Sequence, residues 1–458
     1  MFQRFLRRYT TNTMSRYENW TREQLLERIA ALESSTNVPS KRSIDGKPRK
    51  EQRPFDMSKY SQRHIALKVA YLGWNYMGFA AQGNEEAVPT VEGRLFQALQ
   101  NCRLIVDPDQ CQFSRCGRTD KGVSGLGQVV SLRVRSNLPQ KTEEIPYVET
   151  INRLLPDDIR ILAWAPVSDT FNSRFDCRSR TYKYFFPRGK LDLDLMRQGA
   201  SYFIGEHDFR NFCKLDPSKN ITNYKRTVLS LDIRPVAPPA LGASDSTGFF
   251  EVELKGTAFL WHQVRCIMSI LFLVGQKLER PEIIQDLLNV SKIESRPDYP
   301  MASELPLLLY DCEFDGLDWK YAGNGDAVST GTPVRIYQHW QDLWAEHMTR
   351  TLLCQTFMAS MRGYPVESGS NTLASYLETH QDNPPSVVLG GGKEVRSSRY
   401  KKLLDRPRCD SDQVKKEKYR AKKKQKTITD TTSTPSSSTT TTTTAPTPNN
   451  DNPVDEKQ

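Results

Sequence analysis

The sequence has 458 residues and a formal net charge of +10, a length that suits two or three domains with a large buried core. The charge is concentrated at the ends, because residues 1–16 carry four arginines and no acid, residues 415–426 carry eight cations and one acid, and the remainder is close to neutral. A nucleic-acid partner would therefore have to meet a focused basic patch on the folded body.

The composition argues against a membrane-spanning protein and against a protein built on disulfides or a zinc site. The main apolar run, residues 264–274, is interrupted by Arg265 and Ser269 and is too short for a membrane span. The nine cysteines form no CxxC pair and no Cys/His set with zinc spacing, which indicates a reduced intracellular setting and predicts no metal site.

The chain begins with an extension that we assign to residues 1–60. Its arginine-rich start has the composition of a mitochondrial transit peptide, and a disordered basic arm would look the same. Thr21 and Gln24 form a capping box that predicts a short helix over residues 21–34. That helix fits a docking or self-association element and a frayed surface helix equally well.

The main body is predicted to span residues 61–320. Alternating apolar and polar positions predict strands, and apolar positions three and four apart predict helices. Strands are expected over residues 65–71, 130–135, 181–186, 249–255 and 307–312. Helices are expected from residue 91, capped by Thr90, and over residues 191–199 and 261–274. This order predicts an α+β body with a mostly antiparallel sheet.

The C-terminal part is predicted to hold two further regions. Residues 321–410 form a helical extension whose main element is an amphipathic helix over residues 334–361. Residues 411–458 combine a basic run with a Thr/Ser-rich tail that lacks apolar residues for a core and is expected to be disordered. The basic run fits a nuclear import signal, an extra RNA contact or a solvated surface.

The segment around Asp120 has the strongest chemical signal. Arg118 and Lys121 flank this acid, and Gly117, Gly122, Gly125 and Gly127 allow close approach to the backbone. A carboxylate among cations stays ionised, which suits a nucleophile or an electrostatic anchor. An acid that merely closes a tight turn is the alternative interpretation of this segment alone.

Arg265 and the strand around Tyr182 give two more signals. Burying a guanidinium in an apolar helix is costly unless it pairs with an anion, so Arg265 is expected to pair with Asp120 or a substrate phosphate, or else to reach the surface. His262 has no acid partner visible in the sequence and is expected to pack or to contact RNA. Aromatic residues alternate with cations at residues 180–186, which suits either a base-stacking platform or an aromatic core strand.

Seven segments occur together in an order that resembles the TruA-like family of tRNA pseudouridine synthases. They cover about two-thirds of the chain, and their residues and spacing are typical of the eukaryotic branch that modifies uridines 38 and 39 of the anticodon stem-loop. The matching segments are residues 71–79, 117–123, 152–159, 175–184, 203–209, 259–265 and 305–307.

The resemblance implies a fold, a reaction and a set of site residues. The fold would be two similar α/β halves, meeting near residues 170–190, that form one extended sheet around a basic cleft. The enzyme would be a tRNA-uridine isomerase without metal or cofactor. Asp120 would be the nucleophile, Arg118 would orient it, Tyr182 would stack on the uracil, and Arg265 would pair with Asp120. Lys121, Leu307, Arg180 and His262 would complete the substrate-binding set.

The remaining expectations concern partners and place. The resemblance implies a tRNA substrate and a homodimer, and no membrane partner is expected. The protein is expected in the nucleus and cytoplasm. It is also expected in the mitochondrion if the first residues are a transit peptide. A non-catalytic tRNA-binding protein on the same fold, or a synthase with another target position, stays open. A phosphate-loop hydrolase does not, because no GxxxxGK[ST] motif is present.

Overall fold

The structure is a computed structural model of the whole chain. It describes Thr21 and residues 55–83, 87–218, 221–236, 248–321, 331–366, 372–379, 386–396, 399–411 and 413–421. The chain divides into two units, Met1–Asp56 and Met57–Gln458, and every element below belongs to the second. The helix expected over residues 21–34, the basic start and the Thr/Ser-rich tail lie outside the described residues. In the described part no helix is both long and apolar enough to cross a membrane.

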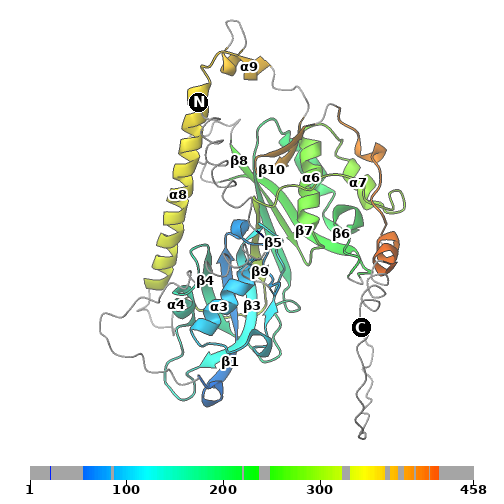
Figure 1. Cartoon of the computed structure of the whole chain (residues 1–458). Helices are drawn as coiled ribbons and strands as arrows, with labels where there is room; N and C mark the ends of the chain where they lie inside the picture. Colours follow the sequence, from blue (N-terminus) through cyan, green and yellow to red (C-terminus); the bar gives the residue numbers. More distant parts are fainter. Residues whose placement is uncertain are drawn as a thin grey trace. The chain divides into compact units, whose positions relative to one another are not determined.

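One large sheet organises the second unit (Figure 1). Among the described residues it contains nine strands in the order β4-β1-β3-β9-β5-β8-β7-β6, with β2 paired to β3. Neighbouring strands are antiparallel except for β3 and β9, which are parallel, so the predicted α+β class with a mostly antiparallel sheet is confirmed. The bounds are β1 Ser61–Tyr71, β2 Ser114–Arg115, β3 Ser124–Ser136, β4 Ile159–Pro166, β5 Ser179–Pro187, β6 Gly205–Asp208, β7 Lys225–Pro235, β8 Phe249–Gly256 and β9 Leu307–Glu313.

Three helices lie close to predicted positions: α3 Val91–Asn101, α5 Leu193–Ser201 and α6 Gln263–Gly275. Two more, α4 Tyr147–Asn152 and α7 Ile283–Leu288, were not predicted. The Thr90 hydroxyl accepts a hydrogen bond from the Gly93 amide, which confirms the predicted cap of α3. All residues of α6 are buried except Arg265, so this helix is a core element with a single polar interruption.

The apolar side chains form two main cores on either side of the middle of the sheet. The first contains residues 65–164 of β1, β3, β4, α3 and α4. The second is built mainly from residues 184–403 of β5, β7, β8 and the helices α5, α6 and α7. Burial of this kind stabilises by about 25 cal/mol per Å² of apolar surface, so each half has its own source of stability.

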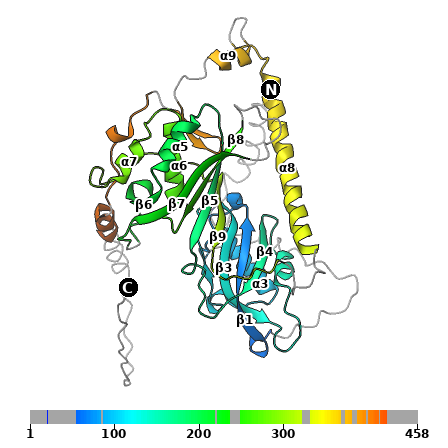
Figure 2. The same ribbon diagram turned by 180° about the vertical axis from the view of Figure 1, so that it is seen from behind.

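Strand β9 joins the two halves. It pairs with β3 of the first half, with Leu309 opposite Gly125, and with β5 of the second half, with Leu309 opposite Tyr182. Figure 2 shows β9 between β3 and β5 from behind. The start of β3 follows the Asp120 loop directly, so the pairing of β9 brings this loop next to residues of the second half.

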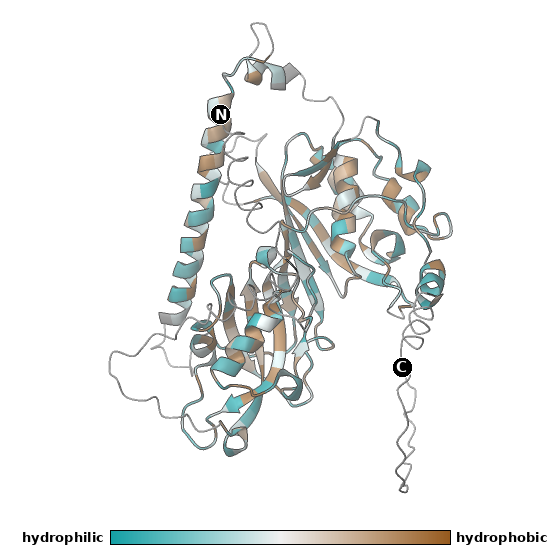
Figure 3. Ribbon diagram, in the orientation of Figure 1, coloured by the Kyte–Doolittle hydropathy of each residue, from teal (hydrophilic) through white to brown (hydrophobic). Residues whose placement is uncertain are grey.

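The C-terminal part contains more than the helical extension expected over residues 321–410. The helices α8 Gly331–Met361 and α9 Leu373–Thr379 are followed by a hairpin of β10 Ser386–Gly390 and β11 Lys393–Arg396. The hairpin packs on the second core: the Gln276 amide group bonds to the backbone of Ser386 and Val388. The two strands were not predicted, because they are short and lie in a stretch that is polar as a whole. Along α8, apolar and polar residues alternate over the whole length (Figure 3).

Candidate active site

The loop that carries Asp120 is held from both sides by hydrogen bonds to buried groups. Before Asp120, the Gln128 side chain bonds to both backbone groups of Gly117, and the Tyr71 hydroxyl bonds to Thr119 at 2.8 Å. After it, the Gly122 amide donates to the Tyr76 carbonyl. Gly122 has a φ of +77°, a conformation that favours glycine. The loop is therefore a rigid support for its carboxylate.

Asp120 lies half-buried, with 24% of its side chain exposed. Its Oδ1 accepts a hydrogen bond from the Trp261 indole at 3.2 Å, and its Oδ2 lies 3.4 Å from His262 Nε2. Burial raises the pKa of Asp120, and Arg265, the Trp261 hydrogen bond, Arg118 and Lys214 oppose that rise. Desolvation is the largest effect, so the net shift of the pKa is upward although four neighbouring groups oppose it. That the carboxylate stays ionised among these cations remains a prediction.

His262 has an acid partner after all, which corrects the expectation from the sequence. It caps α6 in a left-handed conformation, φ 62°, which is uncommon for residues other than glycine. Burial and then Arg265 lower the pKa of His262 to about 3, so it stands beside Asp120 as a neutral imidazole. Its Nδ1 is buried without a hydrogen-bond partner among the described residues, an arrangement that leaves one polar atom for a bound molecule.

Arg265 does not form the direct ion pair with Asp120 that was expected. Its guanidinium instead donates to Glu304 at 2.9 Å and to the Ala302 carbonyl at 2.7 Å. Glu304 also binds Lys393 of β11 at 2.9 Å. Glu304 was not among the predicted site residues, because it lies in the loop before β9, far from α6 in the chain. Arg265 nonetheless lies close enough to be the first of the charges that lower the pKa of Asp120.

Two predicted cations lie at the surface of the loop. Arg118 and Lys121 are both exposed. Within the described residues neither forms an ion pair with Asp120, although the charge of Arg118 lowers the pKa of that carboxyl. Both side chains are therefore free to meet a polyanion beside the carboxylate, and the predicted orienting role of Arg118 stays a prediction.

The aromatic strand divides between core and site. Tyr184 and Phe186 are 1% exposed in the second core, so the platform interpretation is wrong for these two residues. Tyr182 is only partly buried, and its ring packs edge-on against Phe259 with centroids 5.1 Å apart. Leu307, at the start of β9, is buried in the second core opposite Tyr184. Of the three aromatic residues predicted to share a face, Tyr182, Tyr184 and Phe186, only Tyr182 is partly exposed.

Arg180 is the second residue of β5, is partly buried, and bonds to three carbonyl groups. They belong to Thr257 at 2.7 Å, Arg174 at 3.0 Å and Cys116 at 3.2 Å. Three buried cysteines, Cys116, Cys177 and Cys312, also meet beside this residue. Local spacing could not reveal that cluster, since the sheet assembles it from separate segments.

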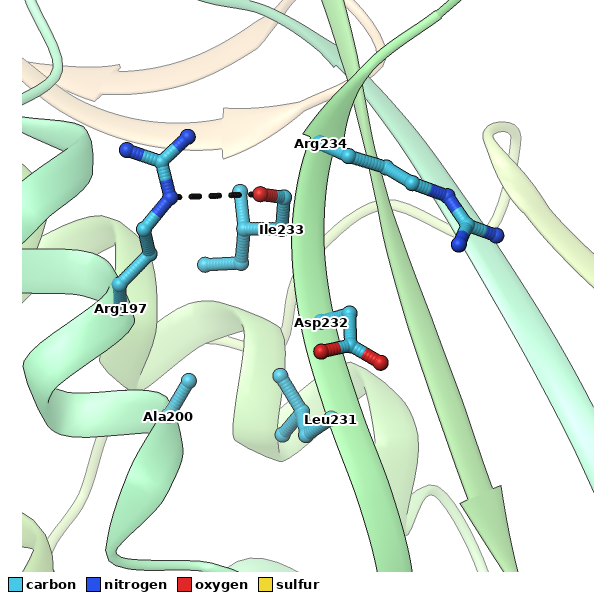
Figure 4. Close-up of a pocket in the computed structure, with 6 residues that line it drawn as sticks. All are labelled: Arg197, Ala200, Leu231, Asp232, Ile233 and Arg234. Carbon is cyan, nitrogen blue, oxygen red and sulfur yellow. Dashed lines mark hydrogen bonds between the residues drawn. The ribbon is translucent and has the colours of Figure 1, made fainter.

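A surface hollow occurs elsewhere, between α5 and β7 (Figure 4). Its main polar contact is a hydrogen bond of 3.3 Å from Arg197 to the Ile233 carbonyl. None of its six lining residues belongs to the predicted site.

The chemistry therefore has to be sought at Asp120, where a half-buried carboxylate, a neutral imidazole and several cations surround one position. A carboxylate without a strong ion-pair partner can attack an electrophilic carbon.

Comparison with known proteins supports a single family. The family model described as tRNA pseudouridine synthase matches residues 200–315. The tRNA pseudouridine(38/39) synthase of Homo sapiens is 40% identical, over 84% of this chain and 85% of that protein. Its counterpart in Saccharomyces cerevisiae is 41% identical, over 88% and 91%. The tRNA pseudouridine synthase A of Methanothermobacter thermautotrophicus is 37% identical, over 50% of this chain and 74% of that protein.

The fold and the Asp120 site thus define a pseudouridine synthase with an α+β sheet formed from two halves. The chain belongs to the tRNA pseudouridine synthase family, in its TruA-like branch. Its enzymatic class is that of isomerases that convert uridine to pseudouridine in tRNA.

Proposed function

We propose that this enzyme isomerises uridine at positions 38 and 39 of tRNA, with Asp120 as the nucleophile. The observation that carries the proposal is the held, half-buried Asp120 carboxylate, in a chain whose relatives named tRNA pseudouridine(38/39) synthase match nearly their full length. In the reaction the bond between N1 and C1′ breaks and a bond between C5 and C1′ forms. The proton at C5 is lost and N1 gains one, so no oxidant or reductant is consumed.

Each predicted residue then has a defined task. Asp120 attacks the nucleotide at C1′ or at C6 of uracil. Tyr182 stacks on the uracil, Leu307 forms part of the apolar wall, and Arg118 and Lys121 meet the phosphates. Arg180, which the sequence also placed in the substrate-binding set, supports the loop through its bond to the Cys116 carbonyl. A uridine inside a stem has to be turned out, which costs a few kcal/mol that stacking and phosphate contacts offset. Arg265 stabilises the anionic form of Asp120 from α6.

The test uses the full-length protein and tRNA transcripts whose candidate uridine stands only at position 38, only at position 39 or at another position. Pseudouridine is mapped by carbodiimide modification and primer extension. We expect Asp120→Asn, which keeps size and loses the nucleophile, to lower the isomerisation rate by at least about 10³-fold while tRNA binding in a gel-shift assay stays within about twofold. Near-normal product in that variant would refute the role of Asp120. Product at another position alone would refute the target.

Two further parts of the proposal concern assembly and location. A homodimer is supported by apolar side chains exposed along α8, where Trp344, Leu353, Phe357 and Met358 are each more than half exposed, since exposed apolar surface marks interaction sites. Sedimentation equilibrium gives the mass: a monomer at micromolar concentration contradicts it. The basic run over residues 415–426 supports a nuclear pool beside a cytoplasmic one, and the arginine-rich start supports a mitochondrial pool.

A further inference from the structure

Three buried thiols meet in the centre of the molecule. Cys116 lies in the Asp120 loop, Cys177 lies just before β5, and Cys312 lies in β9. Their sulfur atoms all lie within 4.8 Å of one another, and the three residues are between 3% and 9% exposed. Because each comes from a different segment, only the folded sheet creates this cluster.

The spacing of the sulfur atoms fits a thiophilic metal ion. Zinc binds thiolate sulfur at about 2.3 Å, which in tetrahedral geometry separates neighbouring sulfur atoms by roughly 3.8 Å. Three thiols that already lie within 4.8 Å reach that spacing through small side-chain adjustments. Structural zinc sites usually have four protein ligands, and three protein ligands with a water molecule in the fourth position are known from catalytic sites. With three thiols, the fourth position of the ion would be taken by a water molecule.

The position of Arg180 fits the same site. Its guanidinium donates to the Cys116 carbonyl at 3.2 Å, and among the described residues no carboxylate lies within ion-pair distance of it. One divalent ion with three thiolates carries a charge of −1, which balances that of Arg180.

We propose that Cys116, Cys177 and Cys312 bind one zinc ion, which fastens the Asp120 loop to β5 and β9. Binding replaces up to three thiol protons by one Zn²⁺, and these protons go to the solvent. The ion is structural: it lies behind the loop, four residues before Asp120, and links the two halves that β9 joins. It takes no part in the isomerisation itself.

The experiment compares the full-length wild type with Cys312→Ser and with the matched control Cys111→Ser. Cys111 is buried as well, 5% exposed, but its sulfur bonds to the Pro108 carbonyl away from the cluster. Each protein is purified under reducing conditions, stripped with a chelator, titrated with zinc sulfate and analysed by mass spectrometry of elements. We expect about one zinc per chain in the wild type and the control, and an affinity at least about tenfold lower in Cys312→Ser.

A second measurement uses the wild type alone, so the proposal can be tested even if Cys312→Ser fails to fold. Co²⁺ added to the stripped wild type should give the sulfur-to-cobalt charge-transfer bands of thiolate ligation, and zinc should abolish them. Wild type that binds no zinc, or Cys312→Ser that folds and binds zinc as tightly as the control, overturns the proposal. Bands with cuprous copper but no response to zinc overturn the choice of metal.

Discussion

The hydrogen bond from Trp261 to Asp120 allows a quantitative test of how the carboxylate is kept ionised. Replacing Trp261 by Phe removes the indole N–H that donates to Oδ1 at 3.2 Å. The aromatic ring that stacks on His262, with centroids 4.4 Å apart, is largely retained. Since the Trp261 bond lowers the pKa of Asp120, its loss should raise that pKa.

The magnitude follows from the geometry. A hydrogen bond to a charged group contributes about 1.5–3 kcal/mol, and the lower figure applies here because the distance is long and Trp261 is 43% exposed. One pKa unit corresponds to 1.36 kcal/mol. The acid limb of the pH profile of kcat/KM, where activity falls as Asp120 is protonated, should therefore move by about one pH unit. The direction is upward: the reactive form is the anion, and a raised pKa means that activity is lost at a higher pH as the solution becomes more acidic.

The assay is the pH dependence of kcat/KM, which reports the groups of the free enzyme. Transcripts with tritium at C5 of uracil release it to water when C5 joins C1′. Trp74→Phe is the matched control, because Trp74 is 42% exposed and its indole donates to the Leu305 carbonyl rather than to a carboxylate. An acid limb that stays in place for Trp261→Phe, or that moves equally for Trp74→Phe, refutes the reasoning.

Two other predictions test the neighbours of the carboxylate. Glu304→Gln removes the anion that holds Arg265, so the acid limb of kcat/KM should move to lower pH, and stability should fall by roughly 1–3 kcal/mol in urea unfolding; a limb that moves upward contradicts this. For His262, whose pKa falls from 6.5 to about 3, the unfolded chain takes up a proton below pH 6.5 that the folded protein does not, so stability is lost as the pH falls. Between pH 7 and pH 5 the loss should be about 2 kcal/mol, and His262→Asn, which tolerates the left-handed backbone, should remove it; an unchanged pH dependence in the variant excludes this cause.

Local sequence signals predicted the elements well where the signal is itself local. The cap at Thr90 and the apolar face of α3 depend on residues a few positions apart, and the same holds for α6, predicted over residues 261–274 and found at Gln263–Gly275. The hairpin over Ser386–Arg396 was not predicted, because its strands have only five and four residues and β11 is largely charged. It forms through bonds to Gln276, a residue that a local pattern does not contain.

At the candidate site, the sequence likewise predicted the individual residues better than the contacts between them. Asp120, His262 and Arg265 were identified individually, but the ion pair expected between Asp120 and Arg265 is replaced by one to Glu304. A buried guanidinium requires an anion. The sequence therefore predicts that Arg265 has an anionic partner, but it does not identify that partner. That choice depends on the loop before β9, whose position is fixed by the pairing of β9 with β3 and β5.

The parallel pairing of β3 with β9 is the step that the sequence conceals most completely. It requires the chain to pass through the whole second half before it returns to the first, so no local pattern contains it. The same pairing places Cys312 of β9 beside Cys116 of the Asp120 loop, and brings Glu304 within reach of Arg265. A single long-range pairing thus decides both the electrostatics of the carboxylate and the assembly of the thiol cluster. A substitution that weakens β9 should therefore alter both properties together, whereas Cys312→Ser should lower zinc affinity and leave the ion pair of Arg265 in place.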